Sequence, residues 1–304
     1  MRILLAYIFV VLLWATTPLA IKWSGEGPGF LFAVTSRMAV GWICILVTLT
    51  VLQQSFVWTR KACLTYVAVA VQIYGSMIAV YWSAQFIPSG WISVIFGLAP
   101  LMTALLALIL LKERHLSFSK LCAYTLGVSG LYVMFGSALN LGDHAILGIA
   151  GVLIATFLQC IGAVWIKQIN AGLPAMIQVG GGLGLALPAY LITWSVVDGQ
   201  WPDKLTTVNL SAIAYLGVIA TTIGFSLYYY LLTHLSPVRV ALISLMTPIM
   251  SLMLGHVANY EPLTRQIMIG TSLILAALVM HEVFDRIDYA LPVRKSNRNT
   301  KSSQ

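Results

Sequence analysis

Two stretches of this sequence align without a gap: YWSAQFIPSGWISVIFGLAPLMTALLALILLKE, from Tyr81 to Glu113, and YYLLTHLSPVRVALISLMTPIMSLMLGHVANYE, from Tyr229 to Glu261. A tyrosine opens both stretches, a glutamate closes both, and Pro100 meets Pro248, each pair being 148 positions apart. The tract between is apolar in both copies. A chain that crosses the bilayer many times and carries two related halves is the usual build of a secondary transporter, with its site at the seam between the halves.

The composition indicates an integral membrane protein. Of the 304 residues, 60% are hydrophobic and only 9% are charged, whereas a soluble domain carries about 25% charged residues. Apolar runs of roughly 20 residues recur, and each can cross a hydrocarbon core. The sequence predicts an all-α integral membrane fold with ten spans, the first of which is not expected to be a cleaved signal peptide. The spans are expected at about 3–23, 29–52, 62–86, 89–111, 117–137, 146–167, 174–197, 209–233, 236–258 and 264–284.

The distribution of the net charge of +8 argues against nucleic-acid binding. If the N-terminus is cytoplasmic, most lysines and arginines lie on the cytoplasmic side, and only Lys22, Lys204 and Arg265 lie outside. This positive-inside bias predicts that both termini face the cytoplasm of a bacterial inner membrane. The basic tail, residues 285–304, is expected to be a flexible end that meets anionic lipid head groups.

The apolar pattern is interrupted near residues 140–145, which predicts a first repeat over 1–140 and a second over 145–284. Each half would hold five spans. Because five is odd, the second half enters the membrane from the opposite side, which is an inverted-topology repeat. The beginnings of the halves also correspond: LWATTPLAIK ends at Lys22 and LQCIGAVWIK ends at Lys167.

The second half carries a specific resemblance, between Tyr215 and Met280. Its features are a Thr-rich start of span eight, a Tyr cluster, Pro248, Glu261 followed by Pro262, Leu263 and Thr264, and Gly270. In the first half Trp14, Lys22, Pro28, Arg37, Pro100 and Glu113 fit the same pattern. The chain resembles the EamA-type branch of the drug/metabolite transporter superfamily, which includes amino-acid and metabolite exporters. The resemblance covers nearly the whole chain but leaves the solute open. Ala15 and His256 depart from the family pattern.

No soluble-enzyme motif is present in the sequence. It has no Walker-type phosphate loop and no His, Cys or Asp cluster with metal spacing, so we expect no catalytic residue, metal or cofactor. A membrane-embedded enzyme would need a convergent set of His, Asp or Ser, and the loops are too short to supply one. A scaffold or sensor without transport stays an alternative.

Several residues are candidates for gating or structure. A charge within a span is costly and needs a partner or a wet cavity, so Arg37 could contact a substrate carboxylate, or could bond backbone carbonyls or reach a head group. Glu113 and Glu261 end spans four and nine, and each could bind the N-terminus of the next span. Proline removes a backbone donor and can kink a helix, so Pro100 and Pro248 are candidate gates.

The family resemblance implies a cavity lined by spans one, three, four, six, eight and nine. Aromatic, hydroxyl and amide side chains occur on most of these spans. The candidate substrate-binding residues are Trp14, Gln72, Tyr74, Tyr81, Gln159, Thr222, Phe225 and Tyr229. Interfacial tyrosine belts and ordinary helix packing are the alternatives for these positions.

Aromatic and amide side chains with few buried charges suit a zwitterionic, cationic or aromatic solute. They argue against phosphorylated sugars, which need several cations. We therefore expect a secondary transporter that moves amino acids or related small metabolites by alternating access, in the direction of export. Transport of small amines such as choline, or of cationic drugs, is the alternative. No span carries a central carboxylate, which favours facilitated diffusion or weak proton linkage, and His256 is the candidate for proton coupling.

Overall fold

The computed structural model describes residues 2–110, 118–138, 142–224, 227, 231, 234 and 237–299. The side chains at 107–108, 118–120, 137–138, 143, 237–242, 282 and 284–299 also lie outside the description. Every element in the described part is helical, as predicted. The helices are α1 (Arg2–Gly25), α2 (Phe30–Val51), α3 (Arg60–Ser83), α4 (Ser89–Phe96), α5 (Ala99–Leu110), α6 (Phe118–Ala138), α7 (Asp143–Ile169), α8 (Ala175–Val197), α9 (Thr207–Ala214), η1 (Tyr215–Ile223), α11 (Pro237–Asn259) and α12 (Arg265–Asn299).

The helices fall at the ten predicted spans. Six of them are long and apolar enough to cross a membrane, and shorter apolar helices lie at the other four positions. The chain is therefore a multi-pass membrane protein. Two spans are divided: the fourth is interrupted at Gly97 and Leu98, between α4 and α5, and the eighth passes from α9 into the π-helix η1.

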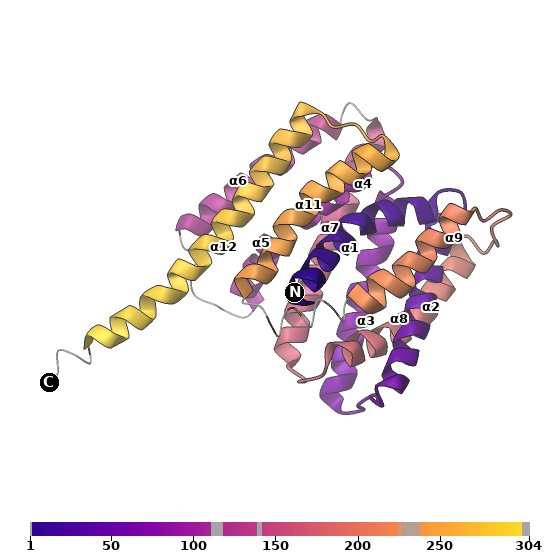
Figure 1. The fold of residues 1–304 in the computed structure, drawn as a ribbon, viewed down its shortest axis with the longest axis horizontal. Helices are drawn as coiled ribbons and strands as arrows, with labels where there is room; N and C mark the ends of the chain where they lie inside the picture. The colour runs from indigo at the N-terminus through magenta and orange to yellow at the C-terminus, as the bar shows by residue number, and fades with distance from the viewer. Residues whose placement is uncertain are drawn as a thin grey trace.

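The helices pack as two inverted repeats. The spans α1, α2, α3, α4–α5 and α6 correspond to α7, α8, α9–η1, α11 and α12. α2 packs on α8, α4 on α11 and α6 on α12, so three spans each meet their own counterpart. α3 packs on α7 and α8, and its counterpart η1 packs on α1 and α2. This exchange of partners is what a pseudo-two-fold axis in the membrane plane produces. Figure 1 shows α6 and α12 at one side of the bundle and α2, α8 and α9 at the other.

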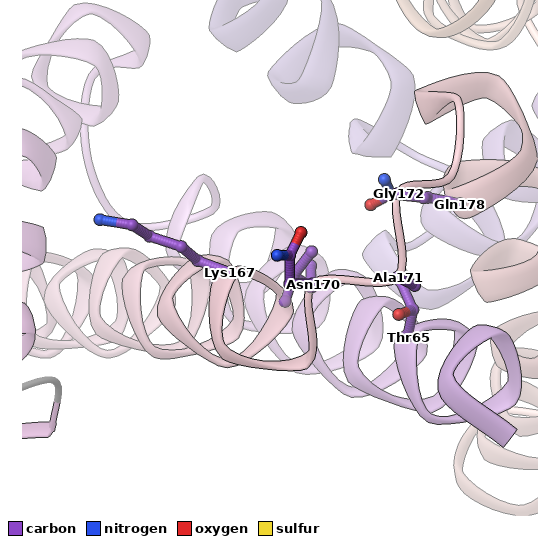
Figure 2. A pocket seen from close by; sticks show the side chains of 7 residues that line it. Thr65, Lys167, Asn170, Ala171, Gly172 and Gln178 are labelled. Atoms are coloured by element: carbon purple, nitrogen blue, oxygen red, sulfur yellow. The ribbon is translucent and has the colours of Figure 1, made fainter.

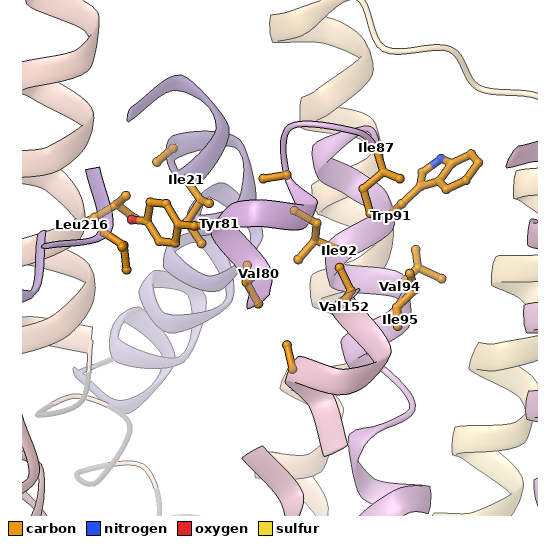
Figure 3. Close-up of a cluster of buried hydrophobic side chains, with 14 of the residues drawn as sticks. Ile21, Val80, Tyr81, Ile87, Trp91, Ile92, Val94, Ile95, Val152 and Leu216 are labelled. Atoms are coloured by element: carbon orange, nitrogen blue, oxygen red, sulfur yellow. The ribbon is translucent and has the colours of Figure 1, made fainter. Parts of the chain in front are cut away.

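The buried core follows α3, α4 and α7. Trp91 and Ile95 are completely buried, and Figure 3 shows them with Val152 of α7 in one cluster. In the same view the ring of Tyr81 lies beside Leu216 of η1. The core therefore joins the first repeat to the second around the third span.

Small residues allow the closest helix contacts. A Cβ placed on Gly130 of α6 would lie 2.7 Å from the carbonyl oxygen of Gly270, and a Cβ on Gly270 would lie 2.7 Å from that of Gly130. Lipid tails supply no hydrophobic drive between helices, so close van der Waals packing of this kind holds membrane bundles together. The Gly130–Gly270 contact fixes α6 against α12.

The last helix is longer than expected. The sequence predicts a flexible end from Asp285, but α12 continues to Asn299, and Figure 1 shows it extending away from the bundle. The structure thus gives residues 285–299 a helical backbone, and the flexibility of this end stays a prediction. No glycine occurs between 271 and 299, so the chain lacks the residue that most often ends a helix.

Replacing Gly130 by valine should lower the melting temperature of the purified protein in detergent. The added side chain must push α6 away from α12, which costs about 1–3 kcal/mol of stability. Each kcal/mol lowers the melting temperature by about 2–4 °C. Gly136→Ala on the same helix is the matched control, because a Cβ there meets nothing within 4 Å. Tryptophan fluorescence measures the melting temperatures. If both variants melt at the same temperature as the unaltered protein, this contact does not stabilise the fold.

Candidate functional site

The carboxylate of Glu261, just after α11, binds the first turn of α4. The backbone N–H of Ser89 donates to Oε1 at 2.9 Å, while the Ser89 hydroxyl and the Gly90 N–H donate to Oε2 at 3.0 and 3.3 Å. Glu261 is only 7% exposed. A carboxylate here satisfies amides that have no partner within the helix and meets the positive end of the helix dipole. Glu261 thus links the second repeat to the first.

The expectation that Glu261 would bind the next span is wrong. The next span is α12, and its first turn already receives a cap, because the Ile267 N–H donates to the Thr264 hydroxyl at 3.3 Å. α4 begins at the same end of the bundle and packs directly on α11. The carboxylate therefore reaches across the repeat boundary.

Two more side chains hold the Glu261 carboxylate. Lys22 Nζ, at the end of α1, lies 3.7 Å from Oε1 and donates to the carbonyl of Ile87 at 3.2 Å. Asn259 donates to Oε1 at 3.0 Å, and its own amide oxygen accepts from the Trp23 indole at 3.2 Å. The group Lys22, Ser89, Gly90, Asn259 and Glu261, called the Glu261 cluster below, ties together α1, α4 and α11.

His256 belongs to the same end of the bundle. Its Nδ1 lies 2.8 Å from the backbone carbonyl of Glu261, and its side chain is exposed. A change in the charge of this ring would therefore act beside the Glu261 cluster. The proton-coupling role expected of His256 stays a prediction.

Arg37 lies inside α2, about 10 Å along the helix from Phe30 at 1.5 Å per residue. It is 8% exposed, and its Nη1 donates to the Tyr81 hydroxyl at 3.5 Å. The guanidinium carbon lies 6.0 Å from the centroid of the Tyr81 ring. The group is therefore buried against a hydroxyl and a ring, and its role in structure or in solute binding stays a prediction.

Two tyrosines lie near Arg37 on other helices. Tyr190 of α8 and Tyr215 of η1 belong to helices that contact α2 close to Arg37. The Thr35 hydroxyl donates to the Tyr190 carbonyl at 3.5 Å, and a Cβ on Gly217 would lie 3.2 Å from the Arg37 carbonyl oxygen. The Tyr190 hydroxyl donates to the carbonyl of Ile73 at 2.8 Å, and the Tyr215 hydroxyl shares a hydrogen bond with that of Thr16 at 2.5 Å. Arg37, Tyr81, Tyr190 and Tyr215 are called the Arg37 group below, and it contains residues of both repeats.

η1 reaches α2 because glycine lines the contact. A Cβ on Gly217 would lie 2.6 Å from a methyl of Val40 and 3.2 Å from the carbonyl oxygen of Arg37. On the facing helix, a Cβ on Gly41 would lie 3.2 Å from the Thr221 methyl. The Thr221 hydroxyl donates to the carbonyl of Leu216 at 2.8 Å, inside the π-helix. Single π-turns often mark functional positions in helices, and this longer one positions Tyr215.

The other predicted binding residues on α3 and α7 make packing contacts. The Gln72 amide donates to the backbone carbonyl of Gln159 at 3.0 Å, which joins α3 to α7. The Tyr74 hydroxyl shares a 2.6 Å hydrogen bond with Thr193, and its ring meets that of Tyr190 edge-on at 5.1 Å between centroids. Tyr74 therefore adjoins the Arg37 group through Tyr190, whereas Gln72 contacts α7.

The remaining predicted residues are dispersed or undescribed. Trp14 packs with the small cluster around Val10 and Leu231, where α1 meets α11. Thr222 is buried in η1. Phe225, Tyr229 and Glu113 lie outside the described residues.

The two predicted proline positions differ in the structure. Pro100 follows the break at Gly97 and Leu98, whereas α11 continues through Pro248. The two regions meet, because a Cβ on Gly97 would lie 3.7 Å from Pro248 Cγ. A span breaks in the first repeat and stays continuous in the second, so the expected matched kinks are not found as helix breaks.

A recess of about 470 Å³ lies at the opposite end of the bundle from the Glu261 cluster. Thr65 of α3, Lys167 and Asn170 near the end of α7, and Gln178 of α8 line it, with Ile166, Ala171 and Gly172. Figure 2 shows Lys167 extending away from Gln178. None of the predicted binding residues lines this recess.

The sequence reasoning missed three of the residues that complete these groups. Tyr190 and Tyr215 could have been noticed in the sequence, since each is a polar ring within an apolar span. Neither span has a helical stripe of polar residues that would distinguish these tyrosines from packing residues. Asn259 lies two residues before Glu261, and this short separation is the sequence feature that could have indicated a contact between them. Lys22 was noticed through the repeat but had no assigned partner.

A ten-span helical bundle of two inverted repeats, with a buried ionic contact across the repeat boundary, defines a membrane transporter. The EamA-like transporter family matches residues 1–136 and 146–281, and the chain belongs to this family. Several of its relatives are named as transporters or efflux pumps, in agreement with the sequence prediction.

Several relatives span most of the chain. A probable amino-acid metabolite efflux pump of Salmonella typhimurium LT2 is 27% identical over 219 residues, 68% of this chain and 72% of its own length. Protein PecM of Dickeya dadantii is 24% identical, over 75% of this chain and 77% of its own. The uncharacterized transporter YoaV of Bacillus subtilis is 22% identical, over 92% and 96%. A crystal structure that is 18% identical superposes with a TM-score of 0.64, over 94% of this chain and 98% of its own, and supports the fold alone.

Glu261→Ala should destabilise the protein, because it leaves the amides of Ser89 and Gly90 buried without their acceptor. Each unsatisfied buried group costs about 1–3 kcal/mol. Glu26→Ala is the matched control, since it removes the same charge from the same end at an exposed position. The melting temperature in detergent should fall for Glu261→Ala and stay within error for Glu26→Ala. Equal small effects for both would contradict a structural role for the Glu261 cluster.

Proposed function

We propose that this transporter exports amino acids or related small metabolites across a bacterial inner membrane. The names of two relatives, both probable amino-acid metabolite efflux pumps, support the solute class and the direction. The positive-inside bias of the sequence supports cytoplasmic termini. With that orientation, the Glu261 cluster lies at the outer end of the bundle and the recess beside Lys167 at the inner end.

Transport proceeds by rocking of the two repeats, 1–140 and 145–284, around a central site. The observation that carries this mechanism is the Glu261 cluster, because it joins the repeats at one end through a carboxylate that binds the start of one helix. Breaking it separates α11 from α4 and opens the outer end. The double match of the family over 1–136 and 146–281 supports these boundaries.

The sequence repeat supplies a counterpart for this contact. Glu113 occupies the position in the first repeat that Glu261 occupies in the second, and the inverted topology assigns it to the inner end. In the proposed cycle the two glutamates act at the two ends in turn. Such an exchange keeps the two states close in free energy, as alternating access requires.

Two further partners follow from the same account. Anionic lipid head groups meet the basic residues between 286 and 301, which the orientation assigns to the inner surface. Protons act through His256, because its ring contacts the backbone of Glu261 and a histidine can change charge near neutral pH.

Exchange flux in proteoliposomes tests this function. Vesicles loaded with an unlabelled amino acid should take up the same amino acid in labelled form from outside. Vesicles loaded with choline or a similar amine should take up its labelled form no faster than protein-free vesicles do. Tyr81→Phe, which removes the hydroxyl that accepts from Arg37, should reduce exchange several-fold through the loss of one charged hydrogen bond. Tyr132→Phe, at a position 79% exposed on α6, is the matched control.

The possible results separate the solute classes. Exchange of choline without exchange of any amino acid would establish the amine alternative and overturn the proposal. In a parallel run with a pH gradient, His256→Ala should lose the effect of the gradient on flux. If that effect survives in the variant, His256 does not couple protons to transport.

A further inference from the structure

Arg37 is a buried cation without a counter-charge among the described residues. Its side chain is 92% buried, and its Nε has no hydrogen-bond partner in the described part of the chain. Lys22 gives the contrast, since it is paired with the carboxylate of Glu261 at 3.7 Å. An unpaired charge in a protein interior destabilises the fold unless something else compensates it.

The neighbours of Arg37 compensate it only weakly. Its hydrogen bond to Tyr81 is long, at 3.5 Å, and the Tyr81 ring lies at 6.0 Å, the outer limit for a cation–π contact. The hydroxyl of Tyr190 is committed to the carbonyl of Ile73, and that of Tyr215 to Thr16. These tyrosines supply aromatic rings and hydroxyls but no negative charge.

The Arg37 group contains residues of both repeats. Arg37 and Tyr81 come from α2 and α3 of the first repeat, while Tyr190 and Tyr215 come from α8 and η1 of the second. Figure 3 shows Tyr81 between Ile21 of α1 and Leu216 of η1, at the junction of the repeats. Solute sites of inverted-repeat transporters lie at this junction, near the membrane midplane.

We propose that Arg37 binds the carboxylate of the transported solute, with Tyr81, Tyr190 and Tyr215 forming the wall of this site. The inference rests on the proposed function and specifies which part of the solute is recognised. A guanidinium presents two parallel N–H donors to a carboxylate, which supplies the missing counter-charge and a partner for Nε. One arginine is too little for a phosphate ester, and its charge repels an amine that has no carboxylate.

The inference also predicts the effect of the arginine on stability. Arg37→Met removes the unpaired charge and keeps an apolar side chain of similar length, so without solute it should melt no lower than the unaltered protein. A residue that only supported the fold would give the opposite result. Arg37→Lys keeps the charge but loses the fork geometry and should bind with intermediate affinity.

Thermal stabilisation of the purified full-length protein by matched pairs of probes tests the site. The probes are L-phenylalanine and L-leucine, each beside its amide, and a simple monocarboxylate such as lactate. At least one carboxylate should raise the melting temperature, and its amide should do so only at about 10- to 100-fold higher concentration, as for the loss of one charged hydrogen-bonded contact. Arg37→Met should lose this preference, and Arg265→Met, at an exposed position, should keep it.

Each result decides the inference separately from the proposed function. A carboxylate preference that survives in Arg37→Met overturns the site, even if amino acids are exchanged in vesicles. A protein that no carboxylate probe stabilises also overturns it. If lactate binds through Arg37 while no amino acid is exchanged, the carboxylate site stands and the amino-acid proposal fails. An Arg37→Met variant that melts far below the unaltered protein assigns Arg37 to the fold instead.

Discussion

A carboxylate buried in a membrane protein must be satisfied from within the protein, and Glu261 is satisfied by the other repeat. It accepts from two backbone amides and a hydroxyl at the start of α4 and lies beside Lys22 of α1. The short loops at this end bring the ends of α1 and α11 to the first turn of α4. Elsewhere in the bundle, helices are joined by hydrogen bonds such as that of Gln72 with the Gln159 carbonyl and by close contacts such as that of Gly130 with Gly270. The arrangement of the three helices therefore depends on one carboxylate.

Arg37 and Glu261, the buried arginine and glutamate among the described residues, have different surroundings, and this difference organises the proposed transport cycle. Glu261 is fully hydrogen-bonded, whereas Arg37 has one long hydrogen bond and a buried Nε without a partner in the described part of the chain. A satisfied charge suits a contact that closes one end of the bundle. An unsatisfied charge suits a site that receives its counter-ion from the solute. The carboxylate of an amino acid then stabilises the state in which Arg37 is enclosed, and its departure returns the protein to the less stable state.

Much of the fold could be predicted from the sequence, because span length and hydropathy follow directly from the thickness of the bilayer. The register between Tyr81–Glu113 and Tyr229–Glu261 was sufficient to predict the inverted repeat. The partner of Glu261 could not be predicted, since sequence does not reveal which helix begins beside a given turn. The same limit hid the grouping of Tyr190 and Tyr215 around Arg37, which depends on helix rotation and on the π-helical turns of η1. Gln72 matched the composition of a binding site, and its amide donates to the backbone carbonyl of Gln159, a contact between α3 and α7 that the sequence does not reveal.

The distance between α4 and α11 at the outer end tests the central claim most directly. Spin labels at Gln85→Cys, just before α4, and at Val257→Cys on α11 report this distance in a background where Cys44, Cys63, Cys122 and Cys160 are replaced. Both labelled positions are exposed. The account predicts a short distance in the unaltered protein and a new, longer one when Glu261→Gln weakens the contact. A single distance, unchanged by Glu261→Gln and by added solute, would contradict a gate at the Glu261 cluster.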